Sequence, residues 1–171
     1  EIAYNVSSLD GGGIYQQNGG DILRNVIIYN EAARNGGGIF SSATAISFNV
    51  IIGNRAGYIG GGISGANGSV GKNIISGNRA ALGSAITNSS AVIYNNTITG
   101  NRVVESGTLN QCYGYVENNI IAFNEGPVDF GGLFGPSINS YNCFWENAGG
   151  AHFSGGALRG ENDLIMNPLF V

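Results

Sequence analysis

Two acidic side chains of this 171-residue sequence share a position in a recurring motif, which makes them its best candidates for catalysis. Glu105 and Asp129 each stand four residues before a leucine, Leu109 and Leu133. If the motif recurs once per turn of a stacked structure, adjacent turns place the two carboxylates about 5 Å apart, the separation found in retaining glycosidases. The matching positions in the two preceding repeats are apolar, so exposed corner acids are the simpler interpretation. We therefore assign no catalytic residue and keep Glu105 and Asp129 as weak candidates.

A row of arginines offers a second kind of chemistry. Arg55, Arg79 and Arg102 each directly follow an asparagine at steps of 24 and 23 residues, and Glu31 and Glu125 hold the same place before and after them. Stacked turns would align these five side chains into one stripe with an acid at each end. Guanidinium groups bind carboxylate, sulfate and phosphate groups well, so the stripe is a candidate site for acidic glycans or lipopolysaccharide. The alternative interpretation is a solvated corner row without a ligand.

The remaining reactive residue types form no site. His152 is the single histidine, and neither Cys112 nor Cys143 has the spacing of a metal ligand. The two cysteines fall two repeats apart on different strands, beyond the limit of about 7 Å between Cα atoms for a disulfide. We predict free thiols, no metal site and no cofactor.

Composition narrows the class of protein. Hydrophobic residues make up 43% of the chain, charged residues only 11%, and there are 30 glycines, which is typical of a turn-rich chain that folds. The formal net charge is −4, and without a basic run we predict no nucleic-acid binding. No apolar run approaches the roughly 20 residues of a membrane span, so we expect no membrane insertion. The first residue, Glu1, fits a processed or excised segment.

The sequence repeats every 23 to 25 residues. Asparagine brackets such as "NVIIYN" at 25–30 recur along the chain, and a second motif, "GGGI" at 36–39 with its variants, keeps nearly the same step. Two motifs with one period define a repeat architecture of about seven units. The asparagines predicted to stack are Asn30, Asn54, Asn78, Asn101 and Asn124 at the closing position and Asn25, Asn49, Asn73, Asn96 and Asn119 at the opening one.

Residue types decide which repeat fold this is. Gly-Gly pairs and β-branched runs disfavour helices, and each unit has room for three strands of about four or five residues plus turns. We predict an all-β fold: a right-handed, single-stranded parallel β-helix (β-solenoid) with about seven coils of 23–25 residues. The right-handed sense is expected from the rule for parallel crossovers. Residues 1–158 form the repeats, and residues 159–171 form a C-terminal non-repeat segment that covers the last coil.

If the repeats stack, the positions that recur in every repeat can be given structural roles. Asparagine tolerates left-handed backbone angles at a corner, and its amide both donates and accepts hydrogen bonds, so stacked copies form a ladder. Inside the brackets an apolar column is predicted to face the core: Ile27, Ile51, Ile75, Ile98, Ile121 and Phe144. The residue after each glycine motif supplies a second core column: Ile14, Ile39, Ile63, Ile86, Leu109, Leu133 and Leu158.

Two short motifs carry a family resemblance. "FSGGAL" at 153–158 and "FWEN" at 144–147 match GGA[ILV] and FxxN signatures, and "IIYN", "IIGN" and "ITGN" match with isoleucine in place of phenylalanine. Over residues 1–158 the chain resembles the chlamydial polymorphic membrane proteins and, more broadly, right-handed parallel β-helix repeat proteins of bacterial surfaces. The resemblance implies an extracellular or bacterial cell-surface segment, similar to an autotransporter passenger used for adhesion or display.

Three functions remain open. The first is a non-catalytic extracellular or cell-surface segment that acts as an adhesin-like binding face or a structural spacer, with glycans or a host or matrix surface as partners. The second is a fragment of a polysaccharide-active, pectate-lyase-like enzyme, either a lyase or a glycoside hydrolase. The third is a subunit of an extracellular filament in which one copy stacks end-on against another, since the first coil begins without a capping segment.

Overall fold

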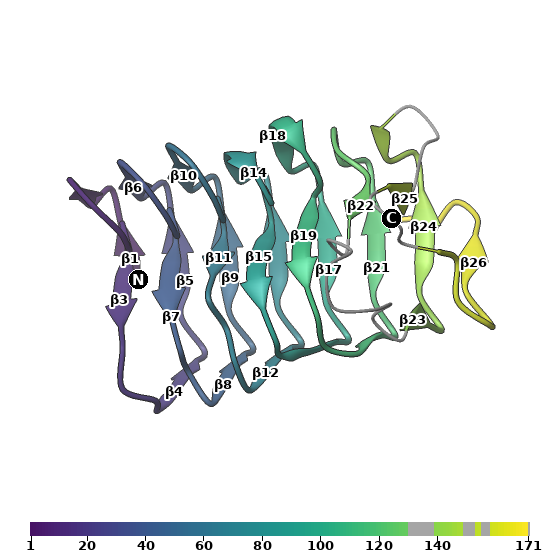
Figure 1. Cartoon of the computed structure of the whole chain (residues 1–171), viewed down its shortest axis with the longest axis horizontal. Coiled ribbons are helices and arrows are strands. Elements are labelled where there is room, and N and C mark those ends of the chain that lie inside the picture. Colours follow the sequence, from purple (N-terminus) through teal and green to yellow (C-terminus); the bar gives the residue numbers. More distant parts are fainter. Residues whose placement is uncertain (130–138, 149–152, 155–157, 171) are drawn as a thin grey trace.

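The described part of the chain winds into a rod of stacked coils, each of which runs through up to four short strands (Figure 1). The computed structural model describes residues 1–129, 139–148, 153–154 and 158–170. Equivalent strands of successive coils pair in parallel and build four sheets, here called A to D. The predicted all-β parallel solenoid is confirmed, and its right-handed sense stays a prediction.

Sheets A and B follow one another along each coil. Sheet A contains β1 (Ile2–Ala3), β5 (Val26–Ile28), β9 (Val50–Ile52), β13 (Ile74–Ser76), β17 (Thr97–Thr99), β21 (Ile120–Ala122), β24 (Cys143–Trp145) and β26 (Leu164–Ile165). Sheet B contains β2 (Val6–Ser7), β6 (Glu31–Ala32), β10 (Arg55–Ala56), β14 (Arg79–Leu82) and β18 (Arg102–Ser106).

Sheets C and D complete each coil. Sheet C contains β3 (Ile14–Gln16), β7 (Ile39–Ser41), β11 (Ile63–Ser64), β15 (Ile86–Ser89), β19 (Leu109–Cys112), β22 (Val128–Asp129) and β25 (Phe153–Ser154). Sheet D contains β4 (Asp21–Leu23), β8 (Ala45–Ser47), β12 (Ser69–Gly71), β16 (Val92–Tyr94), β20 (Val116–Glu117) and β23 (Asn139–Ser140).

The number of strands per coil differs from the prediction. The sequence predicted three strands of four or five residues, whereas most coils hold four strands of two to five residues. A strand of two or three residues is enough because each is hydrogen-bonded to its copies above and below. About six turns are followed by β24 and β25, which extend sheets A and C, and by β26, which adds one more strand to sheet A beyond β24.

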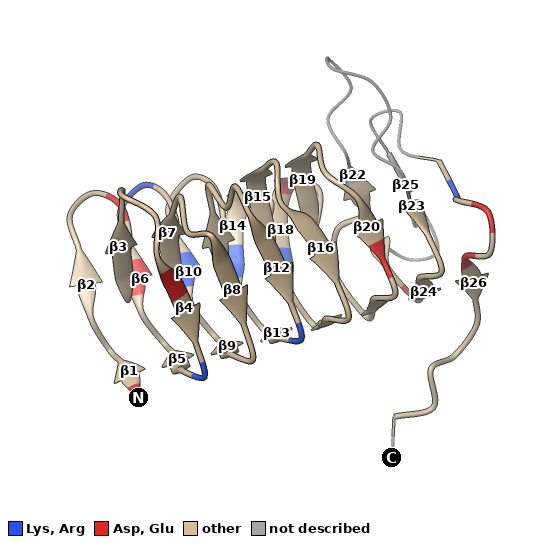
Figure 2. Cartoon of the chain, turned by 90° about the horizontal axis from the view of Figure 1, so that it is seen from below, with Lys and Arg blue, Asp and Glu red and all other residues tan. Residues whose placement is uncertain are grey.

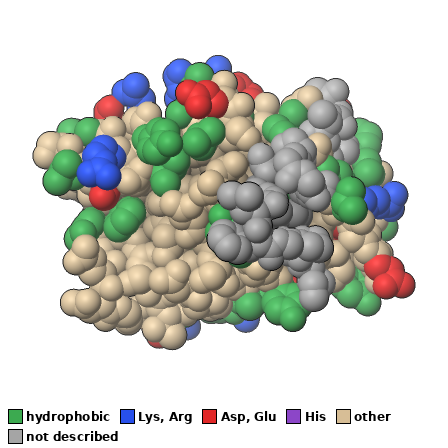
Figure 3. Space-filling model, viewed as in Figure 1, with side chains coloured by type: hydrophobic (Ala, Val, Ile, Leu, Met, Phe, Trp, Pro, Cys, Tyr) green, Lys and Arg blue, Asp and Glu red, His purple; other side chains and the backbone are tan. Residues whose placement is uncertain are grey.

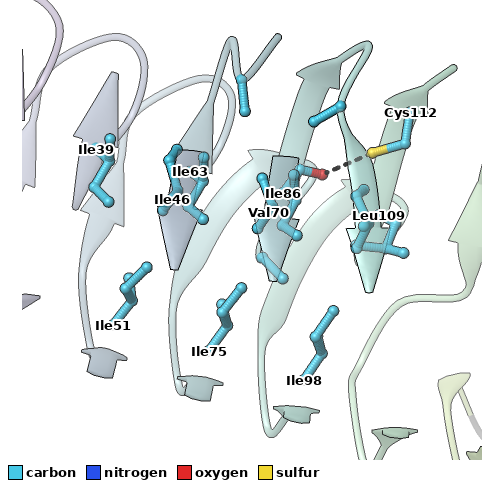
Figure 4. Close-up of a cluster of buried hydrophobic side chains, with 14 of the residues drawn as sticks. Ile39, Ile46, Ile51, Ile63, Val70, Ile75, Ile86, Ile98, Leu109 and Cys112 are labelled. Carbon is cyan, nitrogen blue, oxygen red and sulfur yellow. Dashed lines mark hydrogen bonds between the residues drawn. The ribbon is translucent and has the colours of Figure 1, made fainter. Parts of the chain in front are cut away.

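Apolar columns fill the centre of the rod, as the close-up of the buried side chains shows (Figure 4). The bracket column is confirmed: Ile27, Ile51, Ile75, Ile98, Ile121 and Phe144 are all completely buried. Sheet C supplies the second predicted column from Ile39 to Leu109. Sheet D adds a third column that the motifs did not reveal: Ile22, Ile46, Val70, Ile93 and Val116.

The predicted second column is wrong at its C-terminal end. Val128 pairs with Leu109, and Phe153 pairs with Val128, so these two residues take the places assigned to Leu133 and Leu158. Leu133 lies outside the described residues, and Leu158 is 74% exposed. The physical reason is that no sheet B strand intervenes between β21 and β22, so the chain reaches sheet C after fewer residues than in the earlier coils.

The C-terminal segment continues sheet A beyond the predicted boundary at residue 158. β26 pairs in parallel with β24, with Leu164 beside Cys143 and Ile165 beside Phe144. The apolar side chains expected to cover the last coil are about half exposed: Leu164 52%, Ile165 43%, Met166 48% and Phe170 49%. The segment therefore adds a strand to sheet A, and its apolar side chains stay partly exposed.

Candidate functional site

The corner between sheets A and B positions the arginine row, and a buried asparagine ladder holds that corner. Each ladder asparagine donates from its backbone N–H and its Nδ2 to the Oδ1 of the asparagine one coil later. At Asn78 these two bonds reach Asn101 at 3.0 and 3.1 Å, while Nδ2 also donates to the Ile51 carbonyl at 2.9 Å. The ladder runs through Asn5, Asn30, Asn54, Asn78, Asn101, Asn124 and Asn147.

A second ladder lies at the corner between sheets D and A. It runs through Asn25, Asn49, Asn73, Asn96, Asn119 and Asn142 and ends on Asp163. Both predicted ladders are therefore confirmed. Asp163 ends the second one because only an acceptor is needed there: its Oδ1 accepts from Asn142, and its Oδ2 accepts from the Gly160 N–H at 2.7 Å.

The left-handed residue at these corners is the one before each asparagine, which corrects the expectation that asparagine itself takes that conformation. At the sheet A to B corner the positive φ angles belong to Tyr4, Tyr29, Gly53, Gly77, Gly100, Phe123 and Glu146. Gly77 has a φ of 64°, and with the turn made there the following amide can point into the rod. The residue after the asparagine then begins sheet B with its side chain outside.

The predicted arginine stripe exists and is in register. Arg55 pairs with Arg79, Arg79 pairs with Arg102, and Glu31 pairs with Arg55 on the other side. The Glu125 N–H donates to the Asn101 carbonyl, just as the Arg102 N–H donates to that of Asn78, so Glu125 continues the stripe. Figure 2 shows one red segment on β6 followed by blue segments on β10, β14 and β18.

Glycine and alanine on the inner side keep sheet B close to the rest of the coil. Ala32, Ala56 and Ala80 point inward and are buried. A Cβ on Gly37 would lie 2.4 Å from the carbonyl carbon and oxygen of Arg55, so the glycine turn presses against the backbone that carries the arginines. The stripe therefore stands on a tightly packed support.

Ion pairs leave the middle of the stripe open. Arg55 Nη1 lies 2.7 Å from Glu31 Oε1, and Arg102 Nε lies 2.8 Å from Glu125 Oε1. All four side chains are about half exposed or more. Arg79 is exposed and has no ion pair within the described part of the chain. One cation in the centre of the row is thus free to meet an anion.

The acidic pair predicted from sequence is not assembled. Glu105 lies in β18 of sheet B, where the register shifts by a bulge opposite β14. Asp129 lies in β22 of sheet C and pairs with Asn110. The alignment that placed the two carboxylates one coil apart rested on Leu133, and it is wrong because Val128 takes that column. Glu105 and Asp129 therefore do not occupy equivalent positions of adjacent coils.

The other reactive residues are dispersed. Neither Cys112 nor Cys143 forms a disulfide bond, as predicted. Cys112 is buried in sheet C, whereas Cys143 is partly exposed in sheet A, and burial raises the pKa of the Cys143 thiol. His152 lies outside the described residues. Within the residues described, no group of three or more His, Cys, Asp or Glu side chains is placed to hold a metal ion.

A hollow that the sequence motifs did not indicate lies at the end of β3 and β7. It measures about 410 Å³ and is lined by residues that include Gln17, Asn18, Phe40, Ser42 and Gly65. The available signal was weak: an aromatic residue follows the core isoleucine in the first two glycine motifs, as Tyr15 and Phe40, and polar residues follow it. No pattern of charge or spacing marked these residues.

No protein-family model, no curated protein and no solved structure matches this chain. The resemblance to bacterial surface repeat proteins therefore stays a prediction. The described residues also contain no helix with the length and apolar character that crossing a bilayer requires.

Proposed function

We propose that this chain is a non-catalytic binding segment whose arginine row, Arg55, Arg79 and Arg102, holds an anionic polysaccharide. The observation that supports the proposal most directly is the register of the row, with an unpaired Arg79 between two paired arginines. Such a role belongs to an adhesin-like face at a bacterial cell surface or outside the cell, where polymers of this kind are met.

The geometry of the row suits a repeating ligand. Strand spacing places the Cα atoms of successive arginines about 4.8 Å apart along the rod. Each guanidinium group offers several donors in one plane, which matches the oxygens of a carboxylate or a sulfate. A polymer that carries acidic groups along its length can contact all three arginines, whereas a single small anion can engage only one or two.

A ligand can displace the glutamates that flank the arginine row. Glu31 and Glu125 hold the outer arginines through exposed ion pairs, and exposed pairs are worth only about 0–1 kcal/mol. A polyanion that binds Arg79 can therefore displace either glutamate at small cost. The five charges of the row sum to +1, so we expect binding to weaken strongly as salt rises.

The enzymatic alternative depended on two carboxylates at equivalent positions of adjacent coils. A lyase or hydrolase site needs clustered carboxylates on one face, and Glu105 and Asp129 lie in different sheets. We therefore prefer binding to catalysis for this surface.

The test measures the binding of heparin and of polygalacturonate to the full chain at low and high salt. Arg79→Gln should weaken binding about ten-fold or more, since a hydrogen bond to a charged group contributes about 1.5–3 kcal/mol. Arg24→Gln removes the same charge from the corner between sheets D and A and should change affinity far less. Equal effects of the two variants, or no binding at low salt, would refute the proposal.

A further inference from the structure

The hollow on sheet C differs in chemistry from the arginine row. Its lining consists of amide, hydroxyl, aromatic and glycine groups, with no charged residue among them. Figure 3, which shows this side of the molecule, has mainly backbone and uncharged, non-hydrophobic side chains at its lower left, and most charged side chains lie toward the edges of the view. A site of this composition selects against ions and for an uncharged polar ligand.

An aromatic platform borders the hollow. The rings of Tyr15 and Phe40 stack with centroids 5.4 Å apart and planes 7° from parallel, and Tyr15 is 51% exposed. In the next two coils the same column of sheet C carries Ser64 and Thr87, so the column changes from aromatic to small at Ser64. Phe40 itself lines the hollow, and the neighbouring coil contributes Gly65 to the lining, which has no side chain to fill the space.

Polar groups at the edge of the hollow are partly fixed and partly unused. Ser41 Oγ donates to Gln16 Oε1 at 2.9 Å, and Gln16 Nε2 donates to the Gly19 carbonyl. Gln17 Nε2 donates to the Tyr15 hydroxyl, and Ser42 Oγ donates to the Gln17 carbonyl. Among the described residues, the Gln17 Oε1 and the side-chain amide of the exposed Asn18 have no hydrogen bond. These groups can donate to and accept from hydroxyl groups of a ligand.

We infer that this hollow binds sugar rings of an uncharged polysaccharide. The apolar C–H face of a pyranose packs on the Phe40 ring that lines the hollow, and its hydroxyls meet Gln17 Oε1 and the side-chain amide of Asn18. The volume of about 410 Å³ lies within the usual range of about 300–1,000 Å³ for ligand sites. Since the hollow is open to solvent, it fits a segment of a chain that passes across the rod rather than an enclosed small molecule.

The experiment titrates the full chain with neutral oligosaccharides derived from cellulose, xylan, mannan, chitin and β-1,3-glucan, and follows heat release and backbone amide NMR shifts. We expect saturable binding of at least one of them, with shifts around residues 15–18 and 40–42 and little dependence on salt. Tyr15→Ala removes the ring that stacks on Phe40 and the hydroxyl that accepts from Gln17 Nε2, so it should weaken that binding about three- to ten-fold. Gln17→Ala should weaken it as well.

Tyr115→Ala is the matched control, because Tyr115 is also 51% exposed but precedes β20 in sheet D. Circular dichroism confirms that each variant is folded. The inference fails if no oligosaccharide of the panel binds, if Tyr15→Ala and Gln17→Ala leave the affinity unchanged, or if binding is lost on Arg79→Gln and at high salt. The last result would assign the sugar to the arginine row instead.

Discussion

Asn78 and Arg79 are neighbours in sequence, yet they belong to opposite environments. Asn78 is completely buried; it donates three hydrogen bonds, and its side-chain Oδ1 accepts two. Arg79 is exposed and has no ion pair among the described residues. Both residues recur at the same period in the adjacent coils, so periodicity alone does not separate a structural column from a binding column.

The difference lies in what each side chain does beside its own copy. An asparagine amide both donates and accepts, so identical residues can follow one another through all coils. Identical arginines only donate and repel each other, by about 0.9 kcal/mol per pair at strand spacing in water. The asparagine column therefore continues for seven residues, whereas the arginine column stops after three and ends on glutamate at both sides.

The largest effect is expected from breaking the ladder at its centre. Asn78→Leu removes the acceptor for the Asn54 N–H and the Nδ2 that donates to Asn101 Oδ1 and to the Ile51 carbonyl. The backbone N–H of residue 78 still donates to Asn101 Oδ1, so the groups left without this partner are the Asn54 N–H and the Ile51 carbonyl. Each buried group left without a partner costs about 1–3 kcal/mol, so the free energy of unfolding should fall by about 3 kcal/mol or more. Chemical denaturation with a spectroscopic readout measures the change.

The control for this variant is Ser76→Leu, which adds the same side chain two residues earlier on the outer face of sheet A. Its effect should stay within about 0.5 kcal/mol. If the two variants unfold at the same denaturant concentration, the ladder does not carry the stability assigned to it.

A smaller, pH-dependent effect is expected where the ladder's donor and acceptor roles are exchanged. Asn78→Asp keeps the acceptor but loses the amide donor, and the carboxylate would face Asn101 Oδ1 and the Ile51 carbonyl. The protonated form of the buried carboxyl group is therefore favoured, and the pKa of this group rises above the usual value of about 3.9. The loss of stability should begin to grow near about pH 4, where the unfolded chain ionises, and level off only above the raised pKa.

The reciprocal variant is Asp163→Asn at the end of the other ladder. In the native chain the Gly160 N–H and the Asn142 donors all bind the Asp163 carboxylate. After the substitution, the new amide N–H₂ would face one of these donors instead of accepting from it. We expect a loss of about 1–2 kcal/mol at neutral pH. Unfolding curves from pH 3 to 8 for both variants would contradict this interpretation if Asn78→Asp were equally destabilised across that range.

Much of the fold could be predicted because the bracket motif combines two signals at one spacing. The asparagines are polar residues that stack well, and Ile75 and its counterparts are invariably apolar, so their burial followed from the pattern. Sheet D was missed because its inward residues, such as Val70, lie outside the brackets, three residues before each opening asparagine, where no glycine or asparagine recurs in every coil to mark the start of the strand. The last coils were misaligned because the chain omits a sheet B strand there, and a fixed period does not reveal a shorter path to Val128.

The candidate sites divide in the same way. The arginine stripe was predictable because Arg55 and Arg79 directly follow ladder residues, whose register is strongly determined. The acidic pair failed because Asp129 was placed by a leucine in the misaligned region. The hollow beside Phe40 depends on how side chains of different size meet between adjacent coils, which residue spacing does not encode.

The smallest effect on stability, and the one most specific to the arginine row, is expected from Glu31→Gln. Its ion pair with Arg55 is 2.7 Å long, but the two side chains are 47% and 58% exposed, so its loss should change the free energy of unfolding by less than about 0.5 kcal/mol. The same change frees Arg55 and raises the charge of the row from +1 to +2, so heparin should bind more tightly at low salt. Asp21→Asn changes the net charge equally from the exposed side of sheet D and should increase affinity much less. If both variants increase the affinity for heparin equally, heparin responds to the total charge of the rod. That result would contradict a specific binding site at the in-register arginines.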